Sequence, residues 1–77
     1  MSELPITRPK KLIAVLKRMG FYEVRQKGSH LQLKRGNLLA TVPMHPGDLS
    51  PTVLRSILRQ AHLTIEELKE YLRWARG

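Results

Sequence analysis

Residues 22–43 read YEVRQKGSHLQLKRGNLLATVP. Leu31 and Leu33 alternate with polar residues, which is the two-residue period of a strand with one buried face. The run is broken at Gly28 and at residues 35–37, which are typical of a hairpin turn, and a proline ends it. The pattern predicts three antiparallel strands over residues 22–27, 30–34 and 38–42.

A helix is predicted before these strands, starting at Pro9, because proline suits the first helical position. Gly20 is expected in the left-handed position just past the helix end, with Phe21 folding back onto Leu16. The apolar stripe at helical spacing consists of Leu12, Ile13, Leu16 and Met19.

Two helices are predicted after the strands, beyond a proline-rich loop over residues 43–51. Ser50 is the expected cap of the first, with Pro51 in its first turn. Thr64 and Glu67 have the spacing of a capping box that starts the second, with Leu63 and Leu68 as its hydrophobic staple. The apolar positions are Leu54, Ile57, Leu58 and Ala61 in the first helix, and Leu68, Tyr71, Leu72 and Ala75 in the second.

The expected architecture is therefore an α+β fold made by a single domain over residues 1–77. Helices should cover the sheet face that carries Leu31 and Leu33. The opposite face, with His30, Gln32 and Lys34, should stay in contact with solvent.

The chain has a formal net charge of +8 and an isoelectric point near 10.7. Such a field favours a polyanionic partner, either nucleic acid or an acidic protein. The chain has no cysteine, which excludes disulfides, thiolate nucleophiles and cysteine-based zinc sites. Residues 1–5 lack the features of a secretory signal, and no apolar span is long enough for a membrane, so we expect a cytoplasmic protein.

Residues 25–30, RQKGSH, combine the groups needed for chemistry on a phosphodiester. Arg25 and Lys27 can attract a phosphate, Gly28 permits a tight turn, and Ser29 adds a small hydroxyl donor. His30 can exchange a proton near neutral pH. On these residues alone, catalysis and simple phosphate binding are equally good interpretations of His30.

Five segments of the chain resemble the HicA-type toxins of toxin–antitoxin modules. These are residues 4–5 (LP), 20–21 (GF), 25–30 (RQKGSH), 42–46 (VPMHP) and 54–61 (LRSILRQA). The resemblance implies a fold like the double-stranded-RNA-binding domain, cleavage of mRNA, and a HicB-type antitoxin that covers the active site. The catalytic histidine of the family corresponds to His30. The chain departs from the family pattern at two places. The family usually has Gly-Thr just before the segment that corresponds to residues 54–61, where this chain has Thr52-Val53, and it often has a glycine before the last helix, where this chain has His62.

Metal-independent RNA cleavage needs a base for the 2′-hydroxyl proton, an acid for the leaving 5′-oxygen, and cations for the developing charge. We expect His30 to be essential and His45 to be a possible second proton-transfer group, although a loop histidine is more often simply solvated. No histidine and carboxylate have metal-ligand spacing, so neither metal nor cofactor is expected. The expected RNA-binding residues are Arg25, Lys27, Gly28, Ser29, Lys34, Lys10 and Lys11.

Two other functions fit the same composition. One is a non-catalytic RNA-binding module of the same fold. The Gly28-Ser29-His30 segment distinguishes a nuclease from such a module, because a pure binder has no use for a proton-transfer group there. The other is a basic subunit that docks onto an acidic protein and has no RNA affinity of its own.

Overall fold

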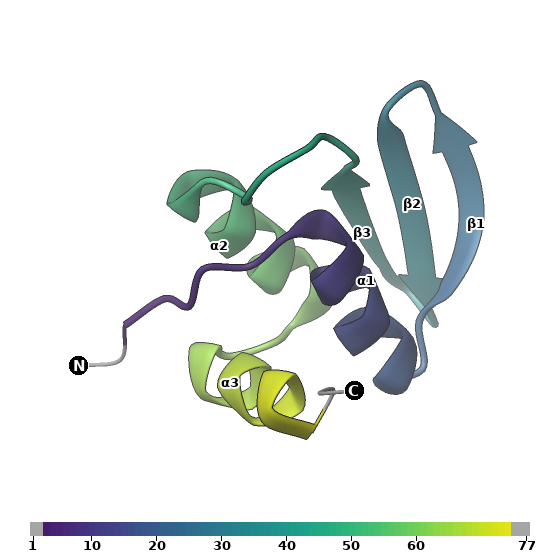
Figure 1. Cartoon of the computed structure of the whole chain (residues 1–77). Coiled ribbons are helices and arrows are strands. Elements are labelled where there is room, and N and C mark those ends of the chain that lie inside the picture. The colour runs from purple at the N-terminus through teal and green to yellow at the C-terminus, as the bar shows by residue number, and fades with distance from the viewer. Residues whose placement is uncertain (1–2, 75–77) are drawn as a thin grey trace.

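The structure is a computed structural model in which residues 3–74 are described. The elements follow the predicted order: α1 (Pro9–Arg18), β1 (Tyr22–Lys27), β2 (His30–Arg35), β3 (Leu38–Pro43), α2 (Pro51–Ala61) and α3 (Ile65–Trp74). The strands form one antiparallel sheet in the order β1-β2-β3, and β2 and β3 each extend one residue beyond their predicted ends. The predicted α+β class with an α-β-β-β-α core is confirmed (Figure 1).

The ends of α1 are set by the residues that the sequence singled out. Pro9 occupies the first helical turn, and Gly20 adopts the positive φ of +103° that follows the last turn. The amide of Phe21 donates to the carbonyl of Leu16 at 3.0 Å, and that of Gly20 donates to Lys17 at 3.0 Å. This pair of bonds is the predicted Schellman motif, and it turns the chain directly into β1.

The starts of α2 and α3 are also capped as predicted. Ser50 Oγ accepts a hydrogen bond from the amide of Val53 at 3.2 Å. In the capping box, the Glu67 amide donates to Thr64 Oγ1 at 3.0 Å, and the Thr64 amide donates to Glu67 Oε1 at 2.9 Å. Between these helices His62 adopts a left-handed conformation at φ 55°, so the position can terminate α2 without a glycine.

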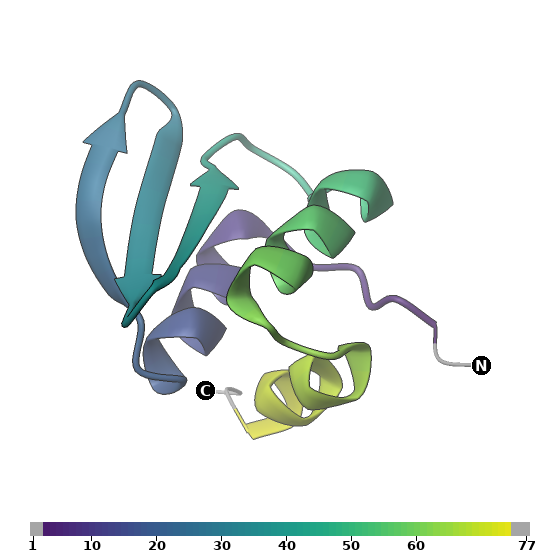
Figure 2. The ribbon, with the colours of Figure 1, turned by 180° about the vertical axis from the view of Figure 1, so that it is seen from behind.

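One hydrophobic core joins the sheet to all three helices. The strands and helices lie on different sides of the molecule, with α3 against α1 (Figures 1 and 2). The inner sheet face contributes buried residues from β2 and β3 only: Leu31, Leu33, Ala40 and Val42. The prediction that Leu31 and Leu33 lie on the covered face is confirmed. Ala75, the last predicted member of the α3 apolar face, lies outside the described residues.

Strand β1 lies beyond this core, and all six of its residues are exposed. Its inner positions, Glu23 and Gln26, pair with Leu33 and Leu31 but carry polar side chains. Glu23 instead forms an ion pair with Lys17 at 2.6 Å, which ties β1 to the end of α1. The register between β1 and β2 shifts between Glu23 and Arg25, so Val24 is an extra residue in β1.

The helices within the described part of the chain are 10 or 11 residues long. None of them has the length and apolar character needed to cross a membrane.

Candidate active site

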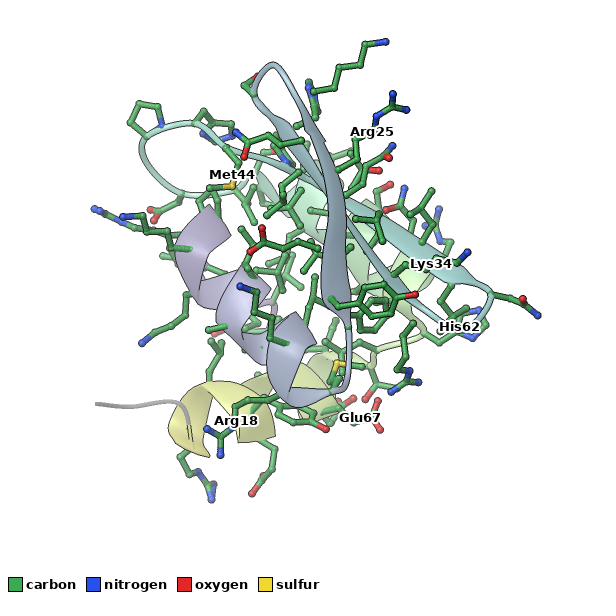
Figure 3. All side chains as sticks on the ribbon, turned by 90° about the vertical axis from the view of Figure 1, so that its right-hand side faces the viewer. Arg18, Arg25, Lys34, Met44, His62 and Glu67 are labelled. Carbon is green, nitrogen blue, oxygen red and sulfur yellow. The ribbon has the colours of Figure 1, made fainter. Side chains whose placement is uncertain are left out.

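The outer face of the sheet brings together four of the predicted site residues: Arg25, Lys27, His30 and Lys34. Its positions form three rows across the strands. They are Lys27, His30 and Pro43 in the first row, Arg25, Gln32 and Thr41 in the second, and Tyr22, Lys34 and Leu39 in the third. Arg25 and Lys34 point away from the side of the sheet on which α1 lies (Figure 3). The nine positions include three permanent cations and no carboxylate, so this face attracts anions.

His30 is the first residue of β2, and its side chain is exposed. Its cross-strand partners are Lys27 on β1 and Pro43 on β3. Within residues 3–73 its imidazole has neither a hydrogen bond nor an ion pair. Both ring nitrogens are therefore available to a substrate, beside a lysine on the same face.

The two-residue turn before His30 depends on Gly28. Its φ of +58° is the conformation that a type II′ hairpin needs at its first central position. A Cβ atom at Gly28 would meet no atom within 4 Å, so the glycine is needed for backbone conformation and not for space. The turn holds Ser29 and the start of β2 in a defined position.

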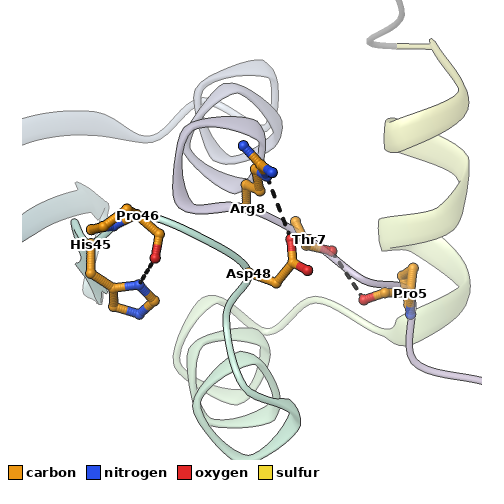
Figure 4. Close-up of polar contacts among 6 residues, drawn as sticks. All are labelled: Pro5, Thr7, Arg8, His45, Pro46 and Asp48. Atoms are coloured by element: carbon orange, nitrogen blue, oxygen red, sulfur yellow. Dashed lines mark hydrogen bonds and ion pairs between the residues drawn. The ribbon is translucent and has the colours of Figure 1, made fainter.

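The loop after β3 packs against this turn. The amide of Met44 donates to the carbonyl of Ser29, so the residues that precede His30 and His45 are hydrogen-bonded to each other. His45 Nδ1 lies 3.0 Å from the carbonyl oxygen of Pro46 (Figure 4). Since a carbonyl only accepts, this bond forms when Nδ1 carries the proton, which leaves Nε2 available for proton transfer. The backbone thus brings both histidines to the same end of the sheet.

His45 borders a pocket of about 360 Å³ between this loop and the start of α1. Arg8 and Lys10 contribute cations to its wall. Arg8 also forms an ion pair with Asp48 at 3.6 Å, which links α1 to the loop (Figure 4). Lys10, one of the predicted RNA-binding residues, is therefore brought together with His45 at this pocket.

The remaining cations of α1 lie elsewhere. Lys11 is exposed on α1 and does not line the pocket, and Lys17 is paired with Glu23. Lys10, Lys11 and Lys17 lie on the helix layer, so they do not share the outer sheet face with Arg25 and Lys34.

Residues 3–73 contain no group of three histidine, cysteine, aspartate or glutamate side chains arranged to hold a metal ion. The carboxylates near the candidate site have other partners: Asp48 pairs with Arg8, and Glu23 pairs with Lys17.

Tyr22 is a residue of the outer face that the sequence analysis did not place there. Strict alternation along β1 would put Tyr22 and Arg25 on opposite faces. The register shift at Val24 puts them on the same face. No local signal in residues 22–27 marks this bulge.

Comparison with protein families gives one match that covers most of the chain. The profile of the HicA toxin of bacterial toxin–antitoxin systems matches residues 9–63, which include α1, the whole sheet and α2. No curated protein matches the sequence. The match contains the hairpin with His30 and the loop with His45, and it extends over more than two thirds of the chain. The chain therefore belongs to the HicA toxin family of bacterial toxin–antitoxin systems.

Proposed function

We propose that this toxin is an endoribonuclease that cleaves mRNA without a metal ion and uses His30 as its essential acid or base. The observation that carries the proposal is the exposed imidazole of His30 beside Lys27 on a cationic sheet face. A histidine placed there has no core to fill and, among the described residues, no structural hydrogen bond to make. Proton transfer to a bound phosphodiester gives it a role.

The proposed reaction is an internal transesterification. A base removes the 2′-hydroxyl proton, and the 2′-oxygen attacks the adjacent phosphorus. The bond to the 5′-oxygen breaks, and an acid protonates that oxygen as it leaves. The products are a 2′,3′-cyclic phosphate and a 5′-hydroxyl, and one such proton-transfer group contributes about 10²–10⁴-fold to the rate.

His45 is the proposed partner of His30 in this acid–base pair. The hydrogen bond between Met44 and Ser29 supports this assignment, because it fixes the His45 loop against the turn that precedes His30. When Nδ1 of His45 carries the proton it donates to the carbonyl of Pro46, and in that tautomer Nε2 is the nitrogen that can exchange a proton with the RNA.

The cations of the outer face are proposed to hold the phosphates. Arg25, Lys27 and Lys34 form no ion pair within residues 3–73, so each can neutralise a phosphate without losing an existing partner. The turn at Gly28 and Ser29 would add backbone donors to the scissile phosphate. Lys10 and Lys11 are proposed to contact the RNA separately, from α1 and not from the outer sheet face.

Cleavage of a defined single-stranded RNA by purified protein in EDTA tests the proposal. We expect the parent to cut, His30→Ala to lose at least about a hundredfold in rate while still binding RNA, and His62→Gly to cut like the parent. His62 is the matched control because it is an exposed histidine at the far end of α2. Equal cutting by parent and His30→Ala would refute the role of His30. RNA binding by both without cutting would instead support the non-catalytic module.

The family implies an antitoxin partner. We propose that this partner is of the HicB type and that it inhibits by covering His30 and its cationic surroundings. Since mRNA and such an antitoxin would both be met in the cytoplasm, we propose that the toxin acts there. An antitoxin complex in which His30 remains open to RNA would contradict this mode of inhibition.

A further inference from the structure

The third row of the outer sheet face differs in character from the other two. Tyr22 is 55% exposed at the start of β1, and Leu39 is 46% exposed on β3. Both are paired in register with Lys34 on the central strand, so an aromatic ring and an aliphatic side chain flank a cation. Exposed apolar side chains at aligned positions mark a binding surface more often than isolated ones do.

The bulge in β1 creates this arrangement. Glu23 pairs with Leu33, and Arg25 pairs with Gln32, so Val24 is left over between them. The extra residue reverses the alternation, and Tyr22 lies on the same face as Arg25. Without the bulge, the ring would lie on the opposite side of the sheet from the cations of the site.

The charge of the face decides which partner it fits. Its nine positions hold three fixed cations and no carboxylate, while Glu23 lies on the inner side and is paired with Lys17. A polyanion complements such a surface. A cationic surface with an exposed aromatic ring is the combination that binds single-stranded nucleic acid, because phosphates meet the cations and a base stacks on the ring.

The distance along β2 connects this row to the candidate catalytic residue. Lys34 follows His30 by four residues on the same strand, which corresponds to roughly 13 Å. A single strand of a few nucleotides can span that distance. Its scissile phosphate would lie at His30, and a neighbouring base would lie over the third row.

We propose that Tyr22 is a base-stacking residue, which holds an unpaired segment of the RNA substrate on the outer sheet face while Lys34 binds the adjacent phosphate. The assignment rests on the proposed function, and it specifies that the substrate at this face is single-stranded. It also makes Tyr22 a positioning residue, because the ring acts through placement of the strand at His30.

Binding of a fluorescently labelled single-stranded RNA tests the proposal in the His30→Ala background, where the strand stays uncut. Tyr22→Ala should weaken binding by about fivefold to more than a hundredfold. Tyr22→Phe should bind within about twofold of the parent, because it retains the ring. Tyr22→Leu separates stacking from apolar contact, and it should resemble Tyr22→Ala.

A second measurement excludes a merely structural effect of these substitutions. A series of RNAs is prepared in which a single abasic nucleotide occupies each position of the strand in turn. If one base stacks on the ring, removing that base should weaken RNA binding to the Tyr22→Phe variant, which keeps the ring, but not to the Tyr22→Ala variant. A strand that tracks from His30 to Tyr22 should also bind more tightly than a fully paired hairpin of equal charge.

The failure of this inference is distinct from failure of the proposed function. RNA binding by Tyr22→Ala and Tyr22→Leu that equals the parent's would overturn the role of Tyr22 while leaving the nuclease intact. If the His30→Ala protein with Tyr22 intact did not bind RNA at all, both the role of Tyr22 and the proposed function would be overturned. A Tyr22→Ala variant that binds RNA normally but loses its protein partner would assign the row to that partner instead.

Discussion

Replacement of the outer-face cations should weaken the salt dependence of RNA binding by an amount that is proportional to the number of cations replaced. Each phosphate that a protein neutralises on a single strand contributes about 0.7 to the slope of log affinity against log salt concentration. Arg25, Lys27 and Lys34 lie on one face, and none is paired within residues 3–73. These three residues should therefore contribute a slope of about 2.1 together.

The expected effect is large enough to measure by fluorescence anisotropy with a labelled single-stranded RNA. Between about 50 and about 200 mM salt, a slope of 2.1 lowers affinity by about 18-fold. Replacing one cation with glutamine leaves a slope of about 1.4 from this face, so the loss of affinity over the same salt range falls to about sevenfold. The His30→Ala background keeps the RNA intact during the titration.

Lys69→Gln is the matched control for net charge, since Lys69 is an exposed lysine on α3. The control variant should keep the parent slope. If Arg25→Gln, Lys27→Gln and Lys34→Gln all keep it as well, the strand does not run over the outer sheet face. The assignment of that face to RNA would then be wrong.

Three further predictions concern the fold that carries the site. Leu33→Ala should lower the free energy of unfolding by about 2–5 kcal/mol in urea titrations, because Leu33 is fully buried on the inner sheet face; a loss below 1 kcal/mol would contradict the packing. His62→Gly should raise stability by about 1 kcal/mol, since His62 has a left-handed φ of 55°, and calorimetry should show a Tm higher by roughly 4–8 °C. An unchanged or lower Tm would show that this conformation is not strained. Thr64→Ala should cost about 1 kcal/mol in urea titrations, because Thr64 Oγ1 accepts the Glu67 amide, whereas no loss would mean that the capping box is not formed in solution.

The elements of the fold could be predicted because their signals are local. Gly20 and Gly28 need positive φ where the chain turns, and both have it. Ser50 and Thr64 supply oxygens for helix-end amides within three residues of themselves. The alternation of leucines in residues 30–34 predicted which face of β2 is buried, and Leu31 and Leu33 are buried there.

The composition of the candidate site could be predicted only in part, because it depends on register and on loop placement. The bulge at Val24 moves Tyr22 to the face of Arg25, and nothing within β1 marks it. The hydrogen bond from Met44 to Ser29 joins residues 15 positions apart, so the approach of His45 to the hairpin was not visible in the sequence.

The sequence also did not show which cations of α1 form ion pairs within the fold. Lys17 and Lys10 have the same charge and lie on the same helix, yet Lys17 is neutralised by Glu23 while Lys10 lines the pocket beside His45. Helical periodicity gives the rotation of each lysine about its own axis but not the neighbour that it meets across the fold. Contacts of this kind come from packing between distant segments.

The most direct test of the account is the chemistry of the ends that the toxin leaves on RNA. Mass spectrometry of the fragments from a short RNA, digested in EDTA, should find a 2′,3′-cyclic phosphate on one fragment and a 5′-hydroxyl on the other. His30→Ala should give neither fragment, and a 2′-deoxy substitution at the cleaved nucleotide should abolish the cut. Fragments with 5′-phosphate ends, or cleavage that persists in His30→Ala, would contradict the claim that His30 transfers a proton during attack by the 2′-hydroxyl.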